Sequence, residues 1–140
     1  MKLVDKMKDE NLGLAILYNF TKGYGHVPMS VYDVVLPFLY HDGFRNHLFE
    51  GVEVEEALTK CVQEDASFIH PILDTIEKDK EMTSRALGIC LLNKYLSFEF
   101  EDNEMKGIYH ESSILDINEA INLGKFFSGK SYEDILNILK

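Results

Sequence analysis

The side chains that commonly hold metals or act in catalysis are spread thinly along this chain of 140 residues. His41 and His47 are six positions apart, and neither an HExxH motif nor any other clustered spacing of His, Cys, Asp and Glu occurs. His26 and His110 fall near expected turns or strand ends, where solvated histidines are common. The sequence therefore predicts no metal site and no cofactor.

The two cysteines give little support for nucleophilic catalysis. Cys61 and Cys90 lie among apolar neighbours, without CxxC spacing or an obvious histidine partner, and the chain has no GxSxG elbow. A disulfide would require an oxidising compartment, and the first ten residues do not resemble an export signal. We expect two buried, reduced thiols. An enzyme that uses Cys61 or Cys90 stays open as an alternative, and it would need a thiol of low pKa.

Glycines and acidic residues give no sign of a phosphate-binding loop or an acid–base pair. Gly23 and Gly25 lack the other glycines of a nucleotide-binding loop and do not follow a strand, so they are better explained as the end of a helix. The acidic clusters around Glu55 and Glu64 lie on the polar sides of amphipathic helices. We predict no catalytic residues and expect that the chain is not an enzyme.

The overall charge bears on the choice of partner. The chain has 24 acidic and 14 basic residues, and its formal net charge is −10. A protein that binds DNA or RNA by itself normally has a basic face, because neutralising phosphates supplies much of the affinity. Lys80, Arg85 and Lys94 form only a sparse basic edge. An acidic surface suits docking onto a basic partner protein, and solubility alone explains it equally well.

The elements that position these residues are mostly helical, because apolar residues recur at helical spacing in most of the chain. We expect helices at 9–24, 30–40, 44–49, 54–62, 68–76, 82–90, 117–124 and 131–139, and a turn at 41–43. Ser30 with Asp33 and Ser131 with Asp134 resemble capping boxes at two helix starts. Pro37 predicts a kink or a break in the second helix.

One segment changes from helical to alternating periodicity. Leu96, Phe98 and Phe100 alternate with polar residues, and Asp102-Asn103 can form a tight two-residue turn. Pairing the strands about this turn sets the register of the hairpin. The predicted pairs are Phe100 with Met105, Leu96 with Tyr109, and Glu99 with Lys106.

Together these elements indicate an α+β fold that is predominantly α-helical. It has several helices, one β-hairpin in the C-terminal half that forms a winged-helix-like unit with the helix before it, and a helical tail. The sequence has no repeats, low-complexity tracts or linkers, so we expect residues 1–140 to form a single domain. The longest apolar stretches are too short to cross a bilayer, and we expect a soluble, cytoplasmic protein without membrane contact.

Two apolar segments are candidates for binding a partner. The first helix is apolar on most sides, which is typical of a helix at the centre of a core or beneath a partner. The tail after Gly124 is richer in apolar residues than a tail usually needs, which favours either a clasp on the chain's own core or a ledge for a partner. The candidate partner-binding residues are Leu17, Phe20, Tyr24, Phe126, Phe127, Ile135 and Leu139.

The order of several motifs along the chain resembles that of a known family. The motifs are Asn11 to Phe20, Gly23-Tyr24, Pro28, Val34 to His41 with its internal proline, Arg45-x-x-Leu48, Leu123 to Phe127, and Ile135-x-x-x-Leu139. In this order and spacing they resemble the small middle component of bacterial ABC-three-component conflict systems. That group includes the middle subunit of Lamassu-type anti-phage defence.

The resemblance implies a non-catalytic adaptor. In such systems an SMC- or Rad50-like ABC ATPase senses nucleic acid, a separate effector, often a nuclease, does the damage, and the middle component joins the two. The chain would then meet nucleic acid only indirectly, through the complex. The alternative is a small winged-helix protein that binds nucleic acid or regulates transcription, based on the helix that contains Arg85 and the hairpin after it.

Overall fold

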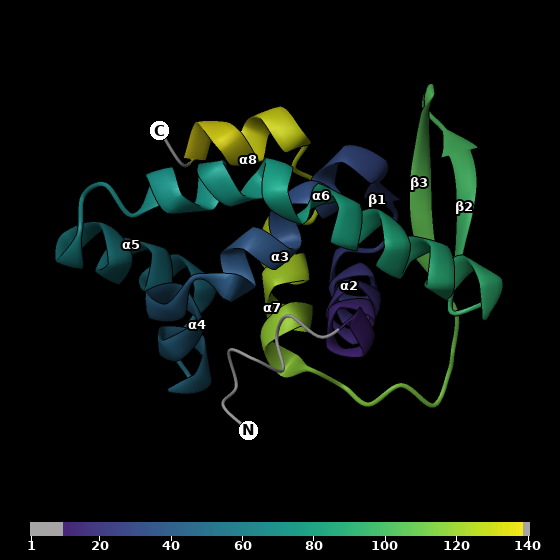
Figure 1. Cartoon of the computed structure of the whole chain (residues 1–140), viewed down its shortest axis with the longest axis horizontal. Coiled ribbons are helices and arrows are strands. Elements are labelled where there is room, and N and C mark those ends of the chain that lie inside the picture. Colours follow the sequence, from purple (N-terminus) through teal and green to yellow (C-terminus); the bar gives the residue numbers. More distant parts are fainter. Residues whose placement is uncertain (1–9, 139–140) are drawn as a thin grey trace.

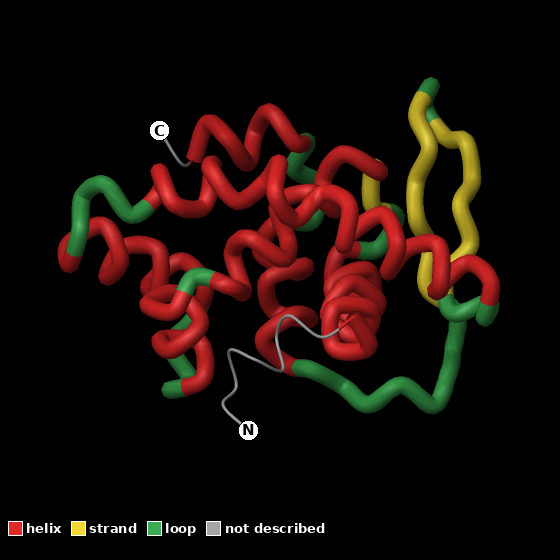
Figure 2. The backbone as a smooth tube through the Cα atoms, in the orientation of Figure 1, coloured by secondary structure: helices red, strands yellow, loops and turns green. Residues whose placement is uncertain are grey.

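The computed structural model describes residues 10–138, which form seven α-helices and one three-stranded antiparallel sheet (Figures 1 and 2). The elements in chain order are α2 (Glu10–Tyr24), β1 (Val27–Pro28), the 3-10 turn η1 (Met29–Val31), α3 (Tyr32–Tyr40), α4 (Asp42–Phe49), α5 (Val54–Glu64), α6 (Ile69–Leu92), β2 (Leu96–Glu101), β3 (Glu104–Tyr109), α7 (Asn118–Phe127) and α8 (Tyr132–Ile138). The predicted fold class, α+β and predominantly helical, is confirmed.

The hairpin of β2 and β3 has the predicted register. Its Cα pairs include Phe100–Met105, Leu96–Tyr109 and Glu99–Lys106. Asp102 and Asn103 have φ angles of 54° and 66°, as a two-residue type I′ turn requires. The ion pair of Lys106 is different from the one expected, because its Nζ lies 3.1 Å from Asp102 Oδ2 in the turn. Glu99 and Lys106 are therefore opposite each other in the strand register, but the ion pair of Lys106 is with Asp102.

A third strand, β1, was not predicted from the sequence. Val27 pairs with Gly107 and Pro28 with Lys106, so the strand order of the sheet is β1-β3-β2. Two residues are too short to show a period, and proline is acceptable at the edge of a sheet. A side chain at Gly107 would collide with the ring of Tyr32, so only glycine lets β3 lie against α3 here.

The helix boundaries correct three expectations. The segments 68–76 and 82–90, expected as two helices, are joined in the single helix α6 of 24 residues, for which Phe68 is the N-cap. The charged residues between these segments interrupt the apolar stripe, but they include neither glycine nor proline and continue the helix easily. The capping box at Ser30 is also wrong, because η1 comes first and the N-cap of α3 is Val31, without a side-chain hydrogen bond.

The third correction concerns the segment around Pro37. Pro37 does not break the second helix, which continues to Tyr40. The predicted turn at 41–43 is a joint of one residue, because α4 already begins at Asp42. His41 makes this sharp joint possible, since its Nδ1 accepts a hydrogen bond of 3.2 Å from the backbone N–H of Phe44 and caps α4.

Helix α2 lies at the centre of the core. It packs against α7, α6, α3 and β3, and Figure 1 shows it nearly end-on among them. Leu17 and Phe20 are fully buried, as expected for a helix that is apolar on most sides. The helix ends at Gly25, whose φ of 107° belongs to the left-handed region.

The contact between α2 and α7 is close enough to exclude side chains. A Cβ atom at Gly124 would meet the backbone carbonyl of Phe20, and a Cβ atom at Gly23 would meet that of Ile121. Backbone atoms cannot yield as a flexible side chain does. Both positions therefore require glycine for packing, although neither has a positive φ.

We predict that Gly124→Ala lowers the free energy of unfolding by about 1–3 kcal/mol, because the added methyl group forces the two helix backbones apart. Gly88→Ala is the matched control. Gly88 is also inside a helix, but it is exposed and nothing lies within 4 Å of an added Cβ. This control should raise the free energy of unfolding by about 0.5–1 kcal/mol through helix propensity. Chemical denaturation measures both, and equal stability of the two variants would contradict the packing argument.

Candidate partner-binding surfaces

The structure divides the seven candidate partner-binding residues into buried and accessible ones. Leu17, Phe20, Phe127 and Ile135 are fully buried in the chain's own core. Tyr24 and Phe126 are half-buried, and Leu139 lies outside the described residues. Of the four buried side chains, Phe127 and Ile135 belong to the tail, and their burial agrees with the alternative in which the tail is a clasp. Partner binding by these residues stays a prediction, and Phe126 lines a groove.

The tail is attached to the end of α2 by specific hydrogen bonds. The hydroxyl of Tyr24 donates to the backbone carbonyl of Lys130 at 2.6 Å, and the hydroxyl of Ser128 donates to that of Tyr24 at 2.8 Å. The predicted capping box of Ser131 and Asp134 is present, with bonds of 3.0 and 3.1 Å. These bonds to Ser131 hold the pKa of Asp134 below its usual value. The loop between α7 and α8 is thus held in place before α8 begins.

A groove runs between α5 and the end of α8. It has a volume of about 480 Å³, and we call it the Phe126 groove. Its lining consists of Glu55, Leu58, Thr59, Val62, Gln63, Phe126 and Ile138. Val62 is 51% exposed and Ile138 is 44% exposed, although both are large apolar side chains. A second hollow of about 340 Å³ beside α5 shares Glu55 and Phe126 with it.

The ring of Phe126 is held in a defined position at this groove. The ammonium group of Lys130 lies 5.2 Å from the ring centroid and donates a hydrogen bond of 3.1 Å to the carbonyl of Phe126. Phe127 packs beside it at a centroid distance of 5.3 Å. The groove therefore has an apolar floor, an acidic side chain from Glu55 and one nearby cation, which suits apolar side chains of another protein.

The residues of this groove were only partly found from the sequence. Val62 has helical spacing with the apolar residues of its helix, yet α5 buries Leu58 and Cys61 and turns Val62 outward. The sequence does hold a sign of this outward position. Cys61 and Val62 are adjacent and point in different directions from a helix, so when Cys61 is buried Val62 turns toward the surface.

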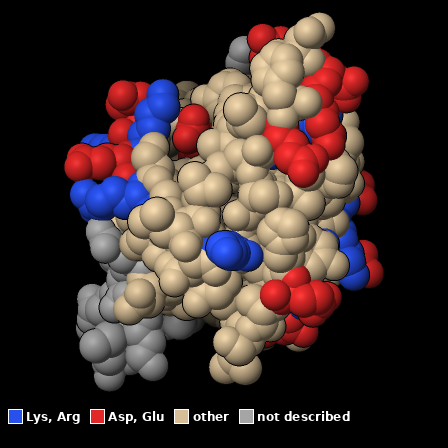
Figure 3. All heavy atoms as spheres, turned by 90° about the vertical axis from the view of Figure 1, so that its right-hand side faces the viewer, with Lys and Arg blue, Asp and Glu red and all other residues tan. Residues whose placement is uncertain are grey.

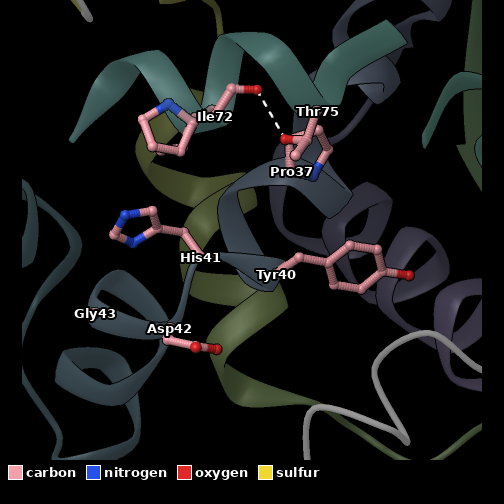
Figure 4. Close-up of a pocket in the computed structure, with 8 residues that line it drawn as sticks. Pro37, Tyr40, His41, Asp42, Gly43, Ile72 and Thr75 are labelled. Atoms are coloured by element: carbon pink, nitrogen blue, oxygen red, sulfur yellow. Dashed lines mark hydrogen bonds between the residues drawn. The ribbon is translucent and has the colours of Figure 1, made fainter. Parts of the chain in front are cut away.

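A smaller hollow of about 270 Å³ lies where the joint between α3 and α4 meets α6 (Figure 4). His41 projects into the space between α4 and α6, and its ring packs edge-on against Phe68 at 5.6 Å. The hydroxyl of Thr75 donates to the carbonyl of Ile72 at 2.9 Å. The ring of His41 also caps α4, so both polar groups make hydrogen bonds within their own helices or at the joint between α3 and α4. We therefore interpret this hollow as a by-product of the helix joint and not as a binding site.

The other end of the molecule carries a different surface. The hairpin extends away from the helices (Figure 1), and Phe100 is 69% exposed and Met105 42% exposed on it. Figure 3 looks onto this end and shows a broad, mostly uncharged area with one basic side chain near its centre and both acidic and basic side chains toward its margins. From the sequence, Phe100 and Met105 were expected only as a pair in the hairpin register.

The described residues do not supply the reactive thiol that the enzyme alternative requires. Cys61 and Cys90 are free and buried. Burial raises the pKa of Cys61 to about 11 and that of Cys90 to about 12, which disfavours the nucleophilic thiolate.

In residues 10–138 there is no group of three or more His, Cys, Asp or Glu that could hold a metal ion. In the same range, no helix has the length and apolar character needed to cross a membrane.

The cap at His41 predicts a pH-dependent stability. Burial is the main cause that lowers the pKa of His41, and Arg45 lowers it further, while Asp42 and Asp65 raise it. The folded state thus favours the neutral ring, whose Nδ1 accepts the capping bond. Its stabilisation is complete above the ordinary pKa of about 6.5 and is lost as the pH falls below it.

We therefore expect the free energy of unfolding to fall by up to about 1 kcal/mol through this site between pH 7.5 and pH 5. His41→Asn keeps a capping acceptor that does not titrate, so its stability should fall less over the same range. Denaturant unfolding of both proteins at the two pH values measures the difference. An identical pH dependence would show that His41 does not titrate with folding.

One comparison with known proteins gives a match that covers nearly the whole chain. The family model of the ABC-three component (ABC-3C) system Middle Component 3 matches residues 12–140. No curated protein and no solved structure gives a match. The matched range includes α2 from its third residue on, the hairpin and the α7–α8 tail, and therefore both surfaces described above. The chain belongs to the family of Middle Component 3 proteins of ABC-three component systems.

Proposed function

We propose that this chain is a non-catalytic adaptor of an anti-phage defence complex, where it joins an SMC- or Rad50-like ABC ATPase to an effector that is often a nuclease. The observation that carries this proposal is the family match over residues 12–140, since a middle component works with other subunits of its system. The assignment to the Lamassu type rests on the motif order in the sequence and is part of the proposal.

The shape of the chain supports an adaptor, which must contact two partners at once. The Phe126 groove is formed by α5 and the end of α8, and the hairpin lies at the opposite end of the molecule (Figure 1). Both surfaces expose large apolar side chains, such as Val62 in the groove and Phe100 on the hairpin. Two partners bound at these ends would not compete for the same residues.

In this proposal the Phe126 groove receives apolar side chains of one partner subunit. Its volume of about 480 Å³ is sufficient for a few such side chains, for example one face of a helix. Apolar anchors that enter a groove commonly supply most of the binding energy of an interface. The exposed rim charges would contribute more to the rate of association than to affinity.

We predict that the double variant Val62→Glu, Ile138→Glu binds its partner subunit at least about tenfold more weakly, because two charges replace the apolar walls of the groove. Leu115→Glu is the control, since Leu115 is 84% exposed in the segment before α7. The tagged chains are co-purified with the products of the neighbouring genes, and the complexes are sized by light scattering. Undiminished binding by the double variant would exclude the groove. A wild-type chain that enters no complex would refute the adaptor proposal.

A winged-helix nucleic-acid binder is the second candidate, and the topology favours it. Helix α6 leads directly into the hairpin, as in the winged-helix-like unit expected from the sequence, and β1 adds a third strand to it. The basic residues of α6 argue against it, because Lys80 lies 4.0 Å from Glu77 and Arg85 lies 3.0 Å from Glu81. These neighbouring carboxylates offset the positive charge that phosphate binding requires.

The two candidates differ in their response to salt. A nucleic-acid binder predicts that the isolated chain binds duplex DNA with an affinity that falls steeply with salt, and that Arg85→Ala makes this dependence shallower. The adaptor proposal predicts no such binding at 150 mM salt. Fluorescence anisotropy with labelled duplex DNA measures both outcomes.

A further inference from the structure

Strand β2 forms a free edge of the sheet. It has six residues, and within residues 10–138 it pairs only with β3, so it ends the strand order β1-β3-β2. Figure 1 shows it at the rim of the molecule, with β3 on its inner side. The backbone N–H of His110 donates to the carbonyl of Tyr95 at 2.9 Å, which identifies Tyr95 and His110 as a hydrogen-bonded pair. Because such pairs alternate along an antiparallel ladder, the N–H and C=O groups of Phe98 and Phe100 point to the free edge.

The side chains of this edge are separated by face. Phe98 and Phe100 lie on one face, where the exposed Met105 is across from Phe100. Glu99 and Glu101 lie on the other face. Glu101 Oε1 lies 2.9 Å from Nδ1 of His26, whereas Glu99 is exposed. Strand β2 is therefore apolar on one face and carries two carboxylates on the other, where Lys106 of β3 lies across from Glu99 and pairs with Asp102.

The same pattern disfavours pairing between two copies of this chain. If two β2 edges met, the acidic face of one would lie beside the acidic face of the other, and Glu99 would face carboxylates across the new ladder. Like charges on an edge strand are a common protection against such pairing. A strand with basic residues on that face would turn this repulsion into attraction.

From these observations we propose that β2 accepts an extended segment of another subunit as an additional strand, and that this segment alternates basic and apolar residues. Its backbone bonds with the outward groups of Phe98 and Phe100, its apolar side chains extend the Phe98–Phe100 face, and its basic side chains lie beside Glu99. The inference rests on the proposed function only in taking the segment from another subunit of the same complex.

The first test uses the full chain and a labelled six-residue peptide that alternates isoleucine with lysine. We expect this peptide to bind at least about tenfold more tightly than the same peptide with glutamate in place of lysine, and Glu99→Lys should reverse the preference. Methylation of the peptide nitrogens that face β2 should abolish binding, because it removes the backbone donors. Equal binding of the lysine and glutamate peptides, or binding that survives methylation, would overturn the proposal.

Two substitutions at one position separate strand addition from simple apolar contact. Phe100→Ala and Phe100→Pro both remove the aromatic ring, but only proline also removes the outward N–H group. The bonds to β3 are kept in both, because this N–H group does not belong to that ladder. We expect Phe100→Ala to weaken peptide binding only severalfold and Phe100→Pro to abolish it. Equal effects of the two substitutions would exclude a backbone ladder.

The final test uses the complex co-purified with the products of the neighbouring genes. Amide hydrogen exchange at Phe98 and Phe100 should slow when the chain enters the complex, whereas Glu99, already bonded within the hairpin, should change little. If the complex forms and these two amides exchange as in the free chain, strand addition is refuted and the adaptor proposal stands. If no complex forms, the adaptor proposal fails, and the peptide experiments alone decide whether β2 accepts an additional strand.

Discussion

The packing of the whole chain depends on the backbone contact at which α2 crosses α7, where Gly23 and Gly124 leave no room for a side chain. This contact brings α7 and the tail after it onto α2. It buries Phe20 and Phe127 together with the residues around them, and it leaves Phe126, the residue before Phe127, at the margin of the core. The Phe126 groove is a consequence of this arrangement, because the packing of α7 against α2 places the ring of Phe126 beside α5.

Polar side chains of α2 give the same helix a second role. Three of them hold the segment between the hairpin and α7: the Tyr18 hydroxyl donates to the carbonyl of His110 at 2.6 Å, the Asn19 amide to that of Leu115 at 3.0 Å, and Lys22 lies 2.9 Å from Asp116. A connecting segment without regular structure is thus held at three points along one helix. Because the hairpin precedes this segment directly, its base is fixed to the core even though its tip extends away from it.

Short-range physical signals could be predicted from the sequence, and long-range packing could not. The hairpin register followed from alternation and the Asp102-Asn103 turn, and the start of α8 followed from Ser131 and Asp134, since each depends on residues a few positions apart. The strand β1 has no local signal, because only its partner Gly107, far along the chain, makes it a strand. The burial of Leu17, Phe20, Phe127 and Ile135 could not be separated from partner binding, because hydrophobicity alone does not say which surface covers a residue. The outward position of Val62 likewise depends on where α7 and α8 lie.

The continuity of α6 has a mechanical consequence. As one unbroken helix of 24 residues, it is a strut of about 36 Å that begins beside α5 and ends at the hairpin. The distance between the two ends of the molecule is therefore set by a residue count. Each residue added to the strut would lengthen it by about 1.5 Å and turn one end by about 100° relative to the other. The distance between the two ends of the molecule and their relative orientation therefore cannot be varied separately, because every insertion or deletion in α6 changes both.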